Sequence, residues 1–269
     1  MALSNTQLDR LGDRLRAAQT EDAVQPDDRT AYHDFRSSLV EGLDSVMQQV
    51  ADISGQTPTS RLKTLNSTVA KLVRQPNTRL SQVQDIVGCR VVVPDRAAQD
   101  KAVEQIRERF PSHQLDDRRE HDQNGYRAVH VIVRLDNGTS VEVQVRTAQE
   151  NQWANLCEHL ADTVDPRLKY GGGSPQLREP LMELSAALHH SDVLEAQIAH
   201  RMAELDQLMK RLRGTHSSTR FNELSPRLES RLADVGELIE QDREMIRRAE
   251  TATTRLSDAA KQALESDQA

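Results

Sequence analysis

Apolar residues recur every three to four positions through much of the chain, as they do along one face of a helix. This spacing predicts helices over residues 30–53, 60–74, 97–109 and 149–163. A shorter helix near the N-terminus leads into a polar, acidic linker that ends at about residue 28. The polar segment at residues 54–58 ends the first of the longer helices.

Segments rich in valine and isoleucine interrupt the helical pattern and predict strands. They cover residues 85–93, 126–135 and 140–147, and residues 113–120 are either a short strand or a loop. Asp136-Asn137-Gly138 joins two of these strands, and Asn-Gly is a strong hairpin signal. The order of elements predicts an α+β fold in which helices pack on a mixed β-sheet.

After residue 175 the pattern changes to a narrow apolar seam with charged residues at the other positions. The seam runs from Leu181 to Leu212, and then from Leu228 to Leu256 after a turn near residues 214–218. A seam of this width predicts either two long antiparallel helices or an oligomerising coiled coil. The predicted organisation is therefore an N-terminal helix and linker (1–28), a central domain (29–170) and a helical tail (176–269).

Polar side chains gather on one face of the predicted hairpin, because successive residues of a strand point to opposite faces. In the second arm the valines share one face, and Glu142, Gln144 and Arg146 share the other. In the first arm Tyr126 and His130 lie on the face opposite the valines. This face is more typical of a binding site than of a solvated sheet, because it combines a carboxylate, an amide, a guanidinium, an imidazole and a phenol.

Two carboxylates on neighbouring strands, Asp85 and Glu142, suit a hard cation such as Mg²⁺, which prefers oxygen ligands and substrate phosphates. Residues 60–84 contain no acidic residue, and Arg61, Lys63 and Lys71 make this segment basic. Arginine and lysine are suited to phosphate oxygens. A metal with cationic groups around a phosphate is what phosphoryl transfer needs. The chain has neither a Walker A sequence nor GxGxxG.

Composition and charge argue against several classes of function and location. The net charge of -7 argues against general nucleic-acid binding by the whole chain. No apolar run approaches the length of a membrane span, and no secretory signal pattern opens the chain, so a cytoplasmic protein without membrane contact is expected. Cys89 and Cys157 lack metal-ligand spacing and are expected to be reduced, partly buried thiols.

Four segments together resemble the RelA/SpoT alarmone synthetases. Arg61-Leu62-Lys63 with Lys71 resembles the ATP-binding helix of that family, and DIVGCR (85–90) resembles its DIxGxR strand. NGYRAVH (124–130) and EVQVRT (142–147) resemble its NGYxSxH and ExQxRT segments. The resemblance covers about residues 40–165 and implies a nucleotidyltransferase-like fold that transfers pyrophosphate from ATP to the 3′-hydroxyl of GDP or GTP.

The resemblance also implies a role for each candidate residue. The ATP phosphates would be held by Arg61, Lys63, Lys71 and Arg90. Asp85 would bind Mg²⁺, and Glu142 would coordinate the metal or activate the 3′-hydroxyl. The acceptor would be bound by Tyr126, His130, Gln144 and Arg146, with the Tyr126 ring stacked on the base.

The sequence does not decide which molecule accepts the pyrophosphate. Housekeeping synthetases of that family usually carry a lysine shortly before the NGY segment, where this chain has His121-Asp122-Gln123. The alternatives to GDP or GTP are the acceptors of the toxin-like branch, namely the 3′ end of tRNA or adenosine nucleotides. A catalytically inactive nucleotide-binding or interaction module is the alternative from another class. The helical tail is expected to mediate homo-oligomerisation or to bind an antitoxin-like protein.

Overall fold

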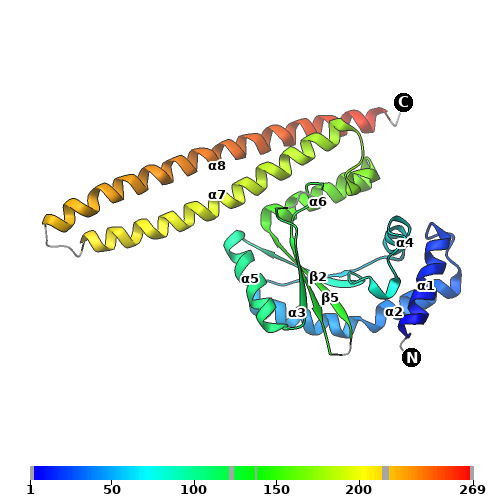
Figure 1. Ribbon diagram of the computed structural model, residues 1–269. Coiled ribbons are helices and arrows are strands. Elements are labelled where there is room, and N and C mark those ends of the chain that lie inside the picture. The colour runs from blue at the N-terminus through cyan, green and yellow to red at the C-terminus, as the bar shows by residue number, and fades with distance from the viewer. Residues whose placement is uncertain (1–2, 121–123, 137, 214–217, 267–269) are drawn as a thin grey trace. The chain divides into compact units, whose positions relative to one another are not determined.

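The computed structural model describes residues 3–120, 124–136, 138–213 and 218–266 (Figure 1). The chain forms two compact units. The first comprises Met1–Val93, Ala98–Asp117 and Ala128–Arg146, and the second comprises Pro94–Ala97, Arg118–Arg127 and Thr147–Ala269. The domain boundaries expected at residues 28, 170 and 176 remain predictions.

A mixed five-stranded sheet with the order β1-β2-β5-β4-β3 organises the first unit. Its strands are β1 (Thr59–Leu62), β2 (Val87–Val93), β3 (His113–Asp117), β4 (Val129–Arg134) and β5 (Ser140–Thr147). The antiparallel pairing of β4 with β5 confirms the predicted hairpin, although Asn137 of its turn lies outside the described residues. Residues 113–120 were expected to be either a short strand or a loop, and the strand β3 is the one observed.

Helices flank this sheet, as the predicted fold class requires (Figure 1). They are α1 (Asn5–Ala18), α2 (Pro26–Ser38), α3 (Val40–Ser54), α4 (Leu65–Arg74) and α5 (Arg96–Arg109), with a short 3-10 helix at Leu80–Gln82. Their apolar faces pack with one face of the sheet in a single core that contains all six valines of β4 and β5 at positions 129, 131, 133, 141, 143 and 145. The opposite, polar face of the sheet is left for the candidate site.

Two predictions about the helices are wrong. The helix expected over residues 30–53 is two helices that meet at Leu39. The Ser38 hydroxyl donates to the Phe35 carbonyl at 2.7 Å and competes there with the regular helical bond. The helix expected over residues 60–74 begins only at Leu65, because the Thr64 hydroxyl caps it by accepting from the Ser67 amide.

Because that helix starts late, Arg61 and Lys63 do not lie on it. Arg61 belongs to β1, which pairs antiparallel with β2, and Lys63 lies in the connection to α4. A third correction concerns the hairpin, since β4 starts at Val129 and Tyr126 precedes it. Tyr126 therefore does not share a strand face with His130.

The second unit is built from α6 (Ala148–Thr163), the 3-10 helix Pro166–Tyr170, α7 (Pro175–Arg213) and α8 (Ser218–Ser266). Its core joins α6 to both long helices through residues such as Trp153, Leu181 and Leu256. The Trp153 indole also donates to the Leu181 carbonyl at 2.8 Å. α7 and α8 run side by side in opposite directions (Figure 1), and the connecting residues 214–217 of the predicted turn lie outside the described residues.

Among the described residues, no helix is both long enough and apolar enough to cross a membrane. Cys89 and Cys157 are buried free thiols, in agreement with the sequence.

A buried carboxyl in the second unit gives a pH-dependent prediction. Asp192 on α7 is 3% exposed and accepts a hydrogen bond from the Thr147 hydroxyl at 2.7 Å. Burial raises its pKa to about 6, and the charge of Glu150 adds to the rise. The folded protein therefore binds a proton more tightly than the unfolded chain, and stability is lost as pH rises from about 4 to about 6.

Replacing Asp192 by Asn is expected to remove this loss, because the neutral amide keeps an oxygen to accept from Thr147. The variant should exceed the parent by about 2 kcal/mol in free energy of unfolding above pH 6 and match it below pH 4. Denaturant unfolding at pH 4 and pH 7 checks this. A variant less stable than the parent at pH 7 would show that the carboxylate is needed in its ionised form.

Candidate active site

The polar face of the hairpin follows from its register. β4 and β5 place His130 opposite Gln144 and Ile132 opposite Glu142. These residues share one face, while the valines between them pack in the core. The strand alternation predicted from the sequence for His130, Glu142 and Gln144 is therefore confirmed.

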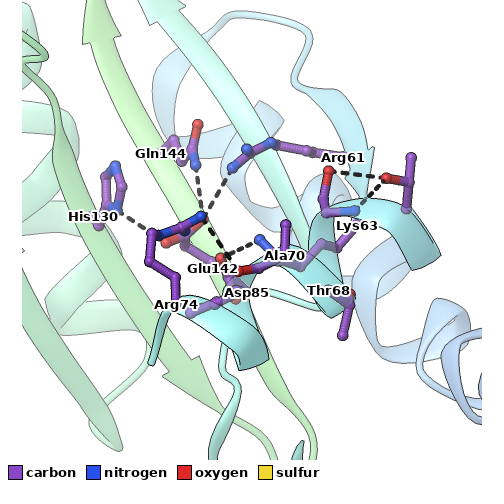
Figure 2. A network of polar contacts seen from close by, with 12 residues as sticks. Arg61, Lys63, Thr68, Ala70, Arg74, Asp85, His130, Glu142 and Gln144 are labelled. Carbon is purple, nitrogen blue, oxygen red and sulfur yellow. Dashed lines mark hydrogen bonds and ion pairs between the residues drawn. The ribbon is translucent and has the colours of Figure 1, made fainter. Parts of the chain in front are cut away.

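Glu142 lies at the centre of a network of polar contacts (Figure 2). The residue is 8% exposed, and its Oε1 lies 2.9 Å from His130 Nδ1. Oε2 accepts from the Gln144 amide at 2.7 Å and lies 3.6 Å from Arg61 Nη1. Burial alone would raise the pKa of this carboxyl, but the hydrogen bond and charge of His130, helped by Gln144, lower the pKa to about 2. Glu142 is therefore an ionised carboxylate held inside the protein.

Asp85, just before β2, supplies a second ionised carboxylate (Figure 2). Its two oxygens accept from Lys63 Nζ and Lys71 Nζ, each at 2.9 Å. Burial opposes ionisation, yet the two ammonium groups lower the pKa of Asp85 to about 2. Burial also lowers the pKa of Lys63, against the effect of Asp85. The structure thus brings both lysines of the basic segment onto one carboxylate.

Gly88 lies close to the backbone of Glu142. It lies on β2 directly opposite Arg61 of β1. A Cβ atom at Gly88 would lie 2.5 Å from the backbone oxygen of Glu142. No side chain fits between β2 and β5 at this point, so the glycine lets the two strands approach each other. Sequence reasoning missed this role, although the glycine inside a valine-rich strand is a signal of close backbone approach.

A second group that sequence reasoning missed fixes the backbone at Lys63. The Tyr32 hydroxyl donates to the Lys63 carbonyl at 2.9 Å and lies 2.7 Å from the Thr68 hydroxyl. Arg36 Nη1 donates to the same carbonyl at 3.2 Å. Tyr32 sits on a helical pattern that gave no reason to separate it from ordinary core residues.

The other three predicted site residues are Arg146, Arg90 and Tyr126, and they lie in different surroundings. Arg146 is fully buried on β5, and its Nη2 donates to the Gln144 amide oxygen at 3.4 Å. Arg90 is half-buried on β2, two residues after Gly88 and so on the same face of that strand. Tyr126 packs against the core of the second unit.

The donor set can be tested against a magnesium ion. Asp85 and Glu142 are both ionised, and each lies next to cationic side chains. Within the described part of the chain, no group of three or more His, Cys, Asp and Glu residues could hold a metal by itself. Two carboxylates without a full protein cage fit Mg²⁺, which keeps waters and binds substrate phosphates.

Comparisons with known proteins show which family the central region resembles. Residues 60–162 match the region found in RelA / SpoT proteins. Uncharacterized protein Rv1366 from Mycobacterium tuberculosis and uncharacterized protein Mb1401 from Mycobacterium bovis are each 38% identical over 122 residues. The match covers 44% of this chain and 44% of either relative, so the chain spans less than half the length of these relatives.

Two solved structures of small alarmone synthetase 1 from Bacillus subtilis are also similar. The one bound to its product pppGpp has a TM-score of 0.53 at 22% identity and covers 65% of this chain and 99% of that chain. The one bound to AMPCPP has a TM-score of 0.50 at 21% identity with the same coverage. At such identities the likeness concerns the fold. Residues 60–162 of this chain are therefore a RelA/SpoT domain, carried on the fold of a small alarmone synthetase.

Proposed function

We propose that this protein is an ATP-dependent pyrophosphokinase that makes (p)ppGpp from GDP or GTP. The observation that carries the proposal is the buried, ionised Glu142 between His130 and Arg61, beside an Asp85 carboxylate paired with two lysines. This network lies within the RelA/SpoT domain. Fixed charges in a partly buried site are what phosphoryl transfer requires.

In the proposed reaction four cationic residues bind the phosphates of ATP, the pyrophosphate donor. They are Arg61, Lys63, Lys71 and Arg90. A lysine ammonium has three N–H donors. Lys63 and Lys71 can therefore keep their contacts with Asp85 and still donate to phosphate oxygens. Asp85 and Glu142 would hold Mg²⁺, which neutralises phosphate charge when bound. The solved relative with AMPCPP is in keeping with an ATP-like donor.

In the proposed reaction the acceptor 3′-oxygen forms a bond to the β-phosphorus of ATP. The bond from that phosphorus to the oxygen bridging the α-phosphate breaks, and AMP leaves. The hydroxyl proton is released to solvent. A carboxylate with a pKa of about 2 is a weak base, so Glu142 acts mainly through its fixed negative charge.

The proposed acceptor is a guanosine nucleotide. His130, Gln144 and Arg146 line the polar face beside Glu142 and are proposed to bind the acceptor. Tyr126 is proposed to stack on its base, from its place before β4. The relative bound to pppGpp supports a guanosine nucleotide.

An acceptor panel tests the proposal. The purified protein is incubated with Mg²⁺, γ-labelled ATP and one acceptor at a time, namely GDP, GTP, ADP, ATP alone or deacylated tRNA. We expect label in a guanosine product. Label on tRNA or on an adenosine nucleotide would replace the acceptor and keep the reaction, whereas no labelled product with any acceptor would contradict the activity itself.

Lys71 gives a test of the donor site. Replacing Lys71 by Met is expected to raise the KM for ATP about 30-fold, because a charge-assisted contact to phosphate is lost. The same change on the exposed Lys101 of α5 should leave KM unchanged. Initial rates at varied ATP measure both. An unchanged KM in the Lys71 variant would remove that residue from the donor site.

The helical tail is proposed to bind a protein, either a second copy of the chain or an antitoxin-like partner. If the chain were instead an inactive module, deleting the tail would abolish the cellular effect and Glu142→Gln would not. The reverse outcome supports catalysis.

A further inference from the structure

The turn that carries Tyr126 is held by helices of the second unit. Asn124 and Gly125 have positive φ angles of 62° and 81°, so the backbone is left-handed at both positions just before Tyr126. Gly125 is buried, and Tyr126 packs against the core that contains Trp153 and Leu181. This turn belongs to the NGY segment, whose tyrosine is proposed above to stack on the acceptor base.

The helices α6 and α7 leave no room for a side chain at Gly125. A Cβ atom there would lie 2.6 Å from Trp153 Cζ2 and 3.2 Å from Met182 Sδ. The Trp153 ring cannot move aside freely, because its indole donates to the Leu181 carbonyl at 2.8 Å. The turn therefore lies against α6 through Trp153 and against α7 through Met182.

Ser185 of α7 makes a direct hydrogen bond to this turn. Its hydroxyl donates to the Gly125 carbonyl, and the residue is only 4% exposed. Removing a hydrogen-bond partner from a buried carbonyl is costly, because water does not readily replace it. Ser185 therefore fixes the direction of the peptide group that joins Gly125 to Tyr126.

The segment between α6 and α7 contacts the turn as well. Gly171 has a φ of 75° and ends the 3-10 helix Pro166–Tyr170. A Cβ atom at Gly171 would lie 2.1 Å from Asn124 Oδ1, so the Asn124 side chain occupies the space that a larger residue would need. Three successive parts of the second unit, namely α6, this connection and α7, thus contact one turn.

We propose that the start of α7 is part of the acceptor site, with Ser185 as a positioning residue that acts through Gly125 on Tyr126. The inference rests on the proposed function, in which Tyr126 stacks on the acceptor base. Ser185 lies beyond residues 60–162, which are the residues that match the RelA/SpoT region. Fixing the turn before the acceptor binds lowers the entropy that is lost on binding.

Steady-state kinetics of Ser185→Ala test the proposal. Loss of the hydroxyl is expected to raise the KM for the acceptor about tenfold, with kcat and the KM for ATP unchanged. A contact with the base is made equally in the ground state and the transition state, so its loss raises KM and leaves kcat. The acceptor used is the one that the panel above identifies.

Ser191→Ala is the matched control. Ser191 lies on the same helix and is also 4% exposed, but it donates to Asp242 of α8 at 2.6 Å. Both variants lose one buried hydroxyl, so both should lose similar stability, whereas only Ser185→Ala should bind the acceptor more weakly. A KM for the acceptor equal to that of the parent in Ser185→Ala, or an equal increase in both variants, would overturn the proposal.

Fluorescence gives a readout that does not depend on turnover. Trp153 is the single tryptophan of the chain and lies against Gly125. Titration with GDP and Mg²⁺ in the absence of ATP, or with whichever acceptor is labelled in the panel, is expected to change its emission. The Kd should be about tenfold higher for Ser185→Ala than for the parent and for Ser191→Ala.

The outcomes separate this inference from the proposed function. No labelled product from the parent with any acceptor would contradict the activity, and this inference with it. An active parent whose Kd and KM for the acceptor are the same in Ser185→Ala would contradict the role of Ser185 alone.

Discussion

Replacing Glu142 by Gln is expected to lower the rate of pyrophosphate transfer by about 10³-fold. The substitution keeps the shape of the side chain and removes the negative charge that His130 and Arg61 surround. It also removes one of the two carboxylates proposed to hold Mg²⁺. The rate constant at saturating ATP and acceptor measures the effect.

Folding must be shown to survive this change. Circular dichroism and the melting temperature of Glu142→Gln should stay close to those of the parent, since the amide fits the same space. Glu104→Gln on α5 serves as control, because Glu104 is exposed and pairs only with Arg107 among the ion pairs of the described residues. Removing an essential charge lowers the rate far more than about tenfold. If Glu142→Gln kept more than about a tenth of the parent rate, the charge of Glu142 would not be essential for the reaction.

Replacing Gly88 by Ala is the change with the largest expected effect on stability. The added Cβ would lie 2.5 Å from the backbone oxygen of Glu142 and 3.3 Å from its Cβ. Backbone atoms of a central strand cannot rotate away as a side chain can, so β2 and β5 must separate. We expect a loss of about 3 kcal/mol in free energy of unfolding, together with loss of transferase activity.

Gly42→Ala is a matched control for this substitution. Its added Cβ would meet Leu135 Cδ1 at 2.8 Å, the far end of a flexible side chain that can move. Alanine also favours the α3 helix by up to about 1 kcal/mol. Denaturant unfolding should therefore place Gly42→Ala near the parent. Equal stability of the two variants would refute the close approach of Gly88 to Glu142.

Strand periodicity made much of this fold predictable. Valines at alternating positions defined the core face of β4 and β5, and the polar residues between them then had to share the other face. The same reasoning failed for β1. Thr59–Leu62 is short and exposed along its length, so no burial pattern marks it as a strand. Its pairing with β2 stabilises it, and that is a tertiary effect absent from local sequence.

The candidate site was predictable where it depends on strand faces and less so where it depends on distant contacts. Glu142, Gln144 and His130 follow from alternation. The joining of Lys63 and Lys71 at Asp85 depends on where α4 begins, which the Thr64 cap decides. Tyr126 was placed on β4 because its neighbours are strand-like, whereas Gly125 before it has a positive φ of 81° that ends any extended pattern.

The central claim is transfer of an intact pyrophosphate group, and the balance of nucleotide products tests it most directly. The protein is incubated with Mg²⁺, γ-labelled ATP and GDP or GTP, and all nucleotides are separated and quantified. The account predicts AMP and a labelled guanosine product in equal amounts, with both formed about 10³-fold more slowly by Glu142→Gln. Formation of ADP in place of AMP, or release of AMP without any labelled acceptor, would contradict it.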